Sequence, residues 1–399
     1  MPGPDCAAIR HRRLKRRVGR WASLKTVWVF GPADKMPFWD TLLRRSVSAA
    51  ALRRASSSGY TAAPVNFATL SGLAVLNPGS RDPDQSFKAG PGQPDEAAHP
   101  PVNYHAYAAC THGAFYCRPA LAARHRSVLL LLRGDLSESQ RAFAVLKAHG
   151  CFVAISFKES GAQQVARQLS KPKRIQRFRE IASSADLCLS STPDLVPLFA
   201  SVSKRTIHVP TPYPFEFISW NFSRPTIERR GVFIGTREFD VLSRNHLLAL
   251  SAARTFSVPI TVINPDGKSG LHRLQALKFP EDQLTVTAPL SYPNYLRLIA
   301  RHRIVLQFDQ SSVPGQVAGD SLLCRVPTVG GNGTVERVAF PELHGSGRTF
   351  DQLVELTRRL LKDEVFYNEQ LAALERCAGA HLSFAKGLES LSRHFPGLT

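Results

Sequence analysis

Short runs of apolar residues alternate with helical patterns along most of the chain. In the second half, such runs lie at 231–236, 258–263, 304–308 and 326–331, and a helical pattern follows at 353–373. Each run is too short for a helix and is bounded by turn residues, which is typical of buried strands. Apolar strands that alternate with helices indicate parallel sheets covered on both faces. The pattern therefore predicts an α/β fold.

The first half shows the same alternation, interrupted by a polar stretch at 77–102. This stretch is rich in Pro, Gly, Asp and Gln, so we expect a long surface loop there. A chain of 399 residues exceeds what one hydrophobic core usually supports, and two domains are expected. Strands are predicted at 26–30, 127–132, 151–157, 186–190 and 206–210, and helices at 38–52, 137–149, 175–183 and 380–394.

The candidate chemistry lies between residues 284 and 343. A short helix is predicted at 319–324, with Asp320 at its start. The strand at 326–331 runs into the sequence Gly330-Gly331-Asn332-Gly333-Thr334, and Glu336 follows in the first turn of the next helix. A glycine-rich turn between strand and helix frees backbone N–H groups and a helix N-terminus to face an anion, commonly a phosphate.

The order of these residues resembles the C-terminal domain of the retaining GT-B glycosyltransferases of family 4. Their signature has two glutamates eight positions apart, then Gly-x-Pro, a glycine-rich turn and a further glutamate. Pro327 falls on the proline, residues 330–333 on the turn and Glu336 on the last glutamate. Asp320 falls on the second glutamate, whereas the first is replaced by Ser312, which supplies no charge.

This resemblance covers residues 230–395 and implies a GT-B architecture, in which two Rossmann-like domains face each other across a cleft. It implies a nucleotide-sugar donor, a glycan or lipid-linked acceptor, retaining hexosyl transfer in polysaccharide biosynthesis, and no metal ion or cofactor. The expected parts are a basic tail at 1–24, an acceptor domain at 25–215, a donor domain at 216–379 and a helix at 380–399 that crosses back to the first domain.

Site residues follow from the same resemblance. Arg237 or Arg244 would face the donor diphosphate, and Asp320 would bind the ribose hydroxyl groups. The residues expected at the reacting centre are Asp320, Ser312 and Arg244, and those expected at the donor are Gly235, Thr236, Arg237, Ser311, Gly330, Gly331, Asn332, Gly333, Thr334 and Glu336.

Simpler interpretations stay open for each feature. An acid at a helix start stabilises the helix dipole, and glycines supply tight turns, without any ligand. Glu336 and Arg244 equally fit a solvated surface. Ser312 leaves open a second function, a non-catalytic GT-B-like protein that binds nucleotide. His105, His112 and His125 are available as a general base, and a zinc site at Cys110, His112 and Cys117 is disfavoured because no second cysteine pair accompanies them.

The excess of positive charge is greatest near the N-terminus. The chain has 51 Lys and Arg against 31 Asp and Glu, and residues 1–60 hold 13 of the former and 3 of the latter. The tract at 10–20 suits either an anionic membrane surface or a solvated basic tail. A basic nucleic-acid or lipid-binding protein is a third, weaker function, since no nucleic-acid recognition motif accompanies the charge.

The expected location and redox state follow from the lengths of the apolar runs and from the cysteines. Its longest apolar run is far below the roughly 18 residues of a membrane span. We therefore expect a cytoplasmic protein, with the tract at 10–20 as its contact with the inner face of the membrane. Seven scattered cysteines indicate reduced thiols.

Overall fold

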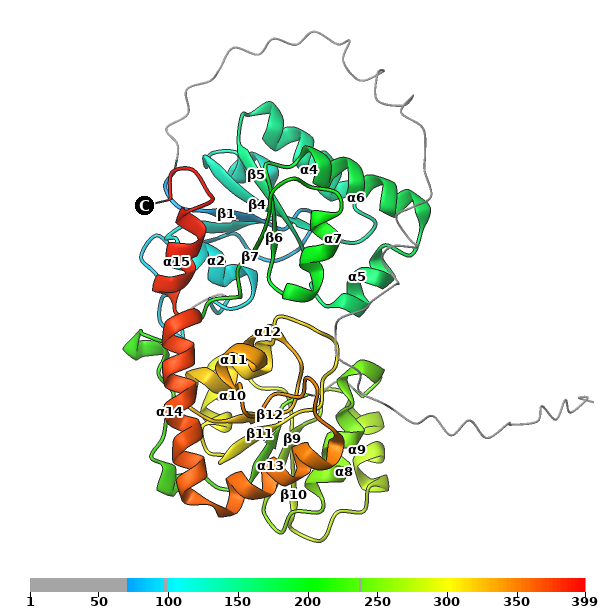
Figure 1. Cartoon of the computed structure of the whole chain (residues 1–399), viewed down its shortest axis with the longest axis vertical. Helices are drawn as coiled ribbons and strands as arrows, with labels where there is room; N and C mark the ends of the chain where they lie inside the picture. The colour runs from blue at the N-terminus through cyan, green and yellow to red at the C-terminus, as the bar shows by residue number, and fades with distance from the viewer. Residues whose placement is uncertain (1–69, 97–98, 237–238, 399) are drawn as a thin grey trace, which may run out of the picture.

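The computed structural model describes residues 70–96, 99–236 and 239–398. They form two α/β domains, one above the other in Figure 1, and two successive helices at the end of the chain that run along one side of them. The basic tract at 10–20, the strand predicted at 26–30, the helix predicted at 38–52 and Arg237 all lie outside the described residues.

Within the described residues, the first domain contains a seven-stranded sheet with the order β2-β3-β1-β4-β5-β6-β7. All neighbours are parallel except β2, which pairs antiparallel with β3 at the edge. The strands are β1 (Ala74–Leu76), β2 (Gln85–Ser86), β3 (Ala114–Tyr116), β4 (Ser127–Leu132), β5 (Phe152–Phe157), β6 (Leu187–Ser190) and β7 (Thr206–His208).

Helices cover both faces of this sheet. Val128, Leu130 and Leu132 of β4 pack into a core on one face, whereas Leu129 and Leu131 pack into a core on the other. Burial on both faces explains why this strand is apolar at nearly every position. The helices are α2 (Tyr104–Cys110), α3 (Pro119–Ala122), α4 (Ser137–Ala148), α5 (Ala162–Gln168), α6 (Pro172–Ser184) and α7 (Val196–Ala200).

The second domain has a five-stranded parallel sheet in the described residues, with the order β10-β9-β8-β11-β12. Its strands are β8 (Val232–Ile234), β9 (Ile260–Ile263), β10 (Leu284–Thr287), β11 (Ile304–Leu306) and β12 (Thr328–Val329). The helices around it are α8 (His246–Ala253), α9 (Gly267–Ala276), α10 (Tyr292–Ile299), α11 (Gln316–Leu323), α12 (Thr334–Ala339) and α13 (Phe350–Lys362).

The last two helices connect the domains. α14 (Glu364–His381) packs against α12 and α13, and α15 (Phe384–Ser392) packs against α2 of the first domain. Leu391 and Phe395 enter the core of the first domain. Figure 1 shows this return as the red end of the chain beside α2.

Two helix predictions in this region are wrong in their bounds. The pattern at 353–373 is divided at Asp363, whose side chain accepts a hydrogen bond from Phe366 N and caps α14. The helix predicted at 380–394 is likewise divided, because Ser383 caps α15 by accepting from Lys386 N. A side chain that accepts a hydrogen bond from a backbone N–H group in this way favours the start of a new helix over continuation of the one before it.

The stretch at 77–102 is mostly loop, as expected, but it contributes the edge strand β2 and the buried ring of Phe87. β1 precedes it and was not anticipated, because a three-residue strand gives too short an apolar run to recognise. Among the described residues, no helix combines the length and apolar character needed to cross a membrane.

Candidate functional site

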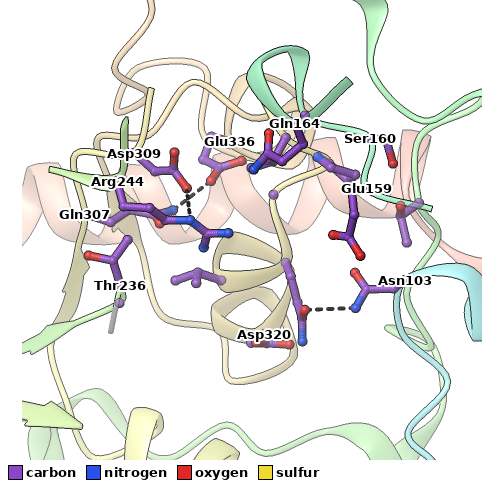
Figure 2. A pocket seen from close by; sticks show the side chains of 18 of the residues that line it. Asn103, Glu159, Ser160, Gln164, Thr236, Arg244, Gln307, Asp309, Asp320 and Glu336 are labelled. Atoms are coloured by element: carbon purple, nitrogen blue, oxygen red, sulfur yellow. Dashed lines mark hydrogen bonds and ion pairs between the residues drawn. The ribbon is translucent and has the colours of Figure 1, made fainter. Parts of the chain in front are cut away.

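A cavity of about 240 Å³ lies between the two domains. It is located where β5 of the first domain and β8 and β11 of the second domain end, the usual ligand position in open parallel sheets. Figure 2 shows side chains from both domains pointing into it. Its polar lining includes Asn103, Lys158, Glu159, Ser160, Gln164, Thr236, Arg244, Gln307, Asp309, Gln316, Asp320 and Glu336.

Asp320 lines this cavity, but not from the start of a helix. α11 begins at Gln316, so Asp320 lies in its second turn and is 2% exposed. The phenol of Tyr292 donates a hydrogen bond of 2.7 Å to Asp320 Oδ1. The interpretation of Asp320 as a helix cap is therefore wrong, and its carboxylate is instead held inside the cavity.

The N-terminus of α11 also faces the cavity. Gly315 precedes the helix with a φ of 94° and carries no capping side chain. Gly315, Gln316 and Val317 line the cavity, and the structure gives the N–H groups of residues 316–318 no acceptor among the described residues. Unpaired N–H groups and the helix dipole make such a terminus suitable for an anion.

Glu336 is buried rather than solvated, so the surface interpretation is wrong. It is 1% exposed, and its Oε1 accepts a hydrogen bond of 2.7 Å from Gln307 Nε2. Its Oε2 has no hydrogen-bond partner among the described residues. Burial is the main reason why the pKa of Glu336 is raised to about 7, and the charge of Asp309 adds to it.

Arg244 contributes a positive charge to the cavity. It is the last residue of the 3₁₀ helix η5 (Leu242–Arg244), which precedes α8. Its Nε lies 3.4 Å from Oδ2 of Asp309, the ion pair drawn in Figure 2. Asp309 is 3% exposed and also accepts a hydrogen bond from Ser311 N. This ion pair holds the guanidinium against the wall of the cavity.

Gly235 and Thr236, which follow β8, line the cavity as well. A Cβ atom at Gly235 would stand 2.5 Å from Val317 Cγ1, so only glycine lets α11 approach the strand. Thr236 Oγ1 lies 2.9 Å from Nδ1 of His246, which is the first residue of α8.

The glycine-rich turn at 330–334 does not face the cavity in the way that was predicted. The N–H groups of Gly330, Asn332 and Thr334 donate to the carbonyl groups of residues 343, 309 and 313, which excludes these three from binding an anion. Gly331 and Asn332 line a separate pocket of about 30 Å³, and Gly330, Gly333 and Thr334 line neither space. The prediction that this turn cradles a phosphate is therefore wrong for the three amides.

Ser311 and Ser312 also lie outside the cavity lining. Ser311 Oγ lies 2.8 Å from Ser243 Oγ. Ser312 N donates to Asn332 Oδ1 at 2.8 Å, and Ser312 Oγ accepts from Asn332 Nδ2 at 3.2 Å. These contacts occupy the polar atoms with neighbours in the protein, so neither serine is placed to meet a ligand in the cavity.

Several lining residues were not predicted from the sequence. Lys158, Glu159 and Ser160 are the first three residues after β5, and Gln307 and Asp309 are the first and third residues after β11. The rule that ligands lie beyond the carboxyl ends of parallel strands points to both segments. Asn103 gave no such signal, because it reaches the cavity from the end of the polar loop.

The cysteine and histidine candidates of the first domain do not line the cavity. His105 stacks on Phe115, with ring centroids 3.8 Å apart, and burial lowers its pKa to about 3. Cys110 is buried, and its thiol pKa is raised for the same reason. No group of three or more His, Cys, Asp or Glu in the described residues is arranged to hold a metal ion.

No family model and no curated relative matches the chain, whereas many solved structures do. Sucrose-phosphate synthase from Thermosynechococcus elongatus is 15% identical, with a TM-score of 0.55, over 80% of this chain and 98% of that one. HepE from Anabaena, in complex with UDP and glucose, is 10% identical, with a TM-score of 0.56, over 81% and 99%.

A UDP-forming trehalose-phosphate synthase from Burkholderia xenovorans is also similar, with 10% identity and a TM-score of 0.51 over 68% of this chain and 73% of that one. Likeness at such low identity concerns the fold. It confirms the predicted GT-B architecture of two Rossmann-like domains.

Proposed function

We propose that the chain is a glycosyltransferase that moves a hexosyl group from a nucleotide-sugar donor to a glycan or lipid-linked acceptor. The observation that carries this proposal is the cavity between the domains, where the N-terminus of α11, Arg244 and Asp320 meet. The similar proteins include one in complex with UDP and glucose and one described as UDP-forming.

The chemistry of the cavity suits a nucleoside diphosphate as leaving group. Developing negative charge is stabilised by donors fixed in advance, and the N–H groups of α11 and the guanidinium of Arg244 supply them without a metal ion. The carboxylate of Asp320, fixed by Tyr292, suits a pair of ribose hydroxyl groups. The resemblance to the retaining family 4 enzymes supports retention of configuration.

The acceptor would enter from the first domain. Lys158, Glu159 and Ser160 form that wall of the cavity, with Asn103 beside them. Asn103 Nδ2 donates a hydrogen bond of 2.8 Å to Gln316 Oε1, so the acceptor and donor walls are in contact. The basic tract at 10–20 would bring the protein to the inner, anionic face of the membrane, where a lipid-linked acceptor is found.

A second function is favoured by one observation. The position that matches the first glutamate of the family signature is Ser312, which has no charge and contacts Asn332 instead of the cavity. An uncharged residue at this position is what we would expect in a protein that binds a nucleotide sugar without transferring it.

A panel of nucleotide sugars separates these possibilities. Thermal shift and sugar release are measured for the native protein, for Asp320→Asn, and for Asp266→Asn as an exposed control. The transferase proposal requires that one donor raises the melting temperature of the native protein and releases its sugar. It also requires that Asp320→Asn abolishes both effects and that Asp266→Asn abolishes neither. Stabilisation without turnover selects the non-catalytic function, and no stabilisation by any member rejects the proposal.

A further inference from the structure

Glu336 lies at the same helix N-terminus that the proposed function assigns to the donor diphosphate. Its Oε2 occupies the space beside Gly315, which precedes α11, and beside Gly333; a Cβ atom at either glycine would collide with it. Both glycines therefore leave room for this carboxyl group. The group is 1% exposed, lines the cavity and has no hydrogen-bond partner for Oε2 within the described residues.

The charged neighbours of Glu336 do not neutralise it. Asp309 is negative and raises the pKa of Glu336, and Arg244 is directed to Asp309. Arg337 lowers the pKa of Glu336 only as a minor cause, since its guanidinium forms an ion pair with Asp194 of the first domain. The phenol of Tyr213 is buried near the same carboxyl group. Burial, to which the charge of Asp309 adds, outweighs the hydrogen bond from Gln307 and the charge of Arg337, and raises the pKa of Glu336 to about 7.

A carboxylate and a diphosphate at one helix terminus would repel each other strongly, because the site is buried and weakly screened. Resting on the proposed function, we propose that Glu336 is protonated when the donor is bound and presents its Oε2–H to a phosphate oxygen. Donor binding then takes up one proton from solvent. Oε1 keeps its hydrogen bond from Gln307 in either state.

The alternative role for the same group is that of an ionised acceptor for a sugar or ribose hydroxyl. The two roles predict opposite results for Glu336→Gln. An amide is uncharged and donates a hydrogen bond, as a protonated carboxyl does, so the variant should keep binding if Glu336 is protonated. It should lose binding if Glu336 acts as a charged acceptor. Glu342→Gln is a matched control, because Glu342 is exposed and lies six residues further along the chain.

The experiment is calorimetric titration of the full chain with UDP-glucose between pH 6 and 8.5, in two buffers of different ionisation enthalpy. ADP-glucose, GDP-glucose, dTDP-glucose and CDP-glucose follow if UDP-glucose does not bind. A nucleotide sugar is used because its phosphate groups, unlike those of a free nucleoside diphosphate, do not titrate in this range. His246, near the cavity, stays neutral throughout, because burial lowers its pKa to about 4.

We expect the native Kd to rise above pH 7, approaching about tenfold per pH unit, with uptake of up to one proton at pH 8. Glu336→Gln should bind within about threefold of the native protein at pH 6 and show no such rise, and Glu342→Gln should behave as the native protein. A flat native profile without proton uptake overturns the inference, as does a loss beyond tenfold in Glu336→Gln at pH 6.

The native profile and proton count decide the matter even if a variant fails to fold, which thermal melting would reveal. Binding without proton uptake overturns this inference and leaves the proposed function intact. Absence of binding by every nucleotide sugar overturns both.

Discussion

The phenolic oxygen of Tyr292 lies 2.7 Å from Oδ1 of Asp320, and this contact joins two helices at the floor of the cavity. Tyr292 begins α10, and Asp320 lies in the second turn of α11. Burial, and after it the charge of Asp320, raises the pKa of Tyr292 well above 10, so the phenol remains a donor at any working pH. Tyr292 is thus a positioning residue for the carboxylate.

Replacing Tyr292 by Phe should weaken nucleotide-sugar binding at least about tenfold, because a hydrogen bond to a charged group contributes roughly 1.5–3 kcal/mol and about 1.4 kcal/mol is a factor of ten. Tyr367→Phe is the control, since Tyr367 is buried in the same domain and its hydroxyl donates to Arg303 O, away from the cavity. Titration of both variants compares the affinities, and urea unfolding compares their stabilities. Equal weakening of binding in the two variants would show that the effect is general destabilisation.

Gly319, the neighbour of Asp320 in α11, is required by the close approach of Tyr213. A Cβ atom at Gly319 would overlap the Tyr213 ring, which is fully buried. Gly319→Ala should therefore lower the free energy of unfolding by about 1–3 kcal/mol.

Gly379→Ala, in α14, is the opposite case and serves as its control. Nothing lies within 4 Å of the added methyl group, and alanine favours a helix over glycine by up to about 1 kcal/mol. Urea unfolding of the two variants should give shifts of opposite sign. A stable Gly319→Ala variant would mean that Tyr213 moves away at little cost.

Much of the fold followed from the sequence wherever a strand is buried on both faces. The run at 127–132 matches β4 because all six of its residues are buried. The bounds of β11 and β12 were less certain, since their apolar runs continue into turns where Gln307, Gly330 and Gly331 leave the sheet.

The site was harder to predict, for physical reasons that concern particular residues. The start of α11 is hidden because Gly315 caps it without a side chain, so Asp320 was taken as the first acid of a helix. Glu336 has the sequence pattern of a solvated acid, and only its packing against Gly315 and Gly333 buries it. Residues 158–161 form a wall of the cavity from the first domain. Local sequence patterns do not show which segments of two domains face each other, so these residues could not be assigned to the site.

Arg244→Gln should weaken nucleotide-sugar binding at least tenfold. The change removes positive charge from a cavity that also holds Asp309, Asp320 and Glu336, and it leaves the buried Asp309 without its ion pair. Arg254→Gln, an exposed position just after α8, should bind as the native protein does. Full affinity in Arg244→Gln at low salt would show that the guanidinium serves only to neutralise Asp309.

Acid should destabilise the protein, and His302 gives a specific test of the reason. Its Nδ1 lies 2.9 Å from Leu298 O, so Nδ1 carries the proton, and Nε2 accepts from the hydroxyl of Thr261 at 2.8 Å. The neutral ring thus satisfies both contacts, and burial lowers the pKa of His302 to about 4.

An unfolded chain binds a proton at this histidine below about pH 6.5, whereas the folded chain does so only near pH 4. Its contribution to stability is therefore complete above pH 6.5 and is lost as the pH falls toward 4. Between pH 7 and 5 the loss should be about 2 kcal/mol smaller in His302→Gln than in the native protein, as measured by urea unfolding. His272→Gln, at an exposed position, should keep the full loss. An identical pH dependence in all three proteins would show that the pKa of His302 is the same in the folded and the unfolded chain.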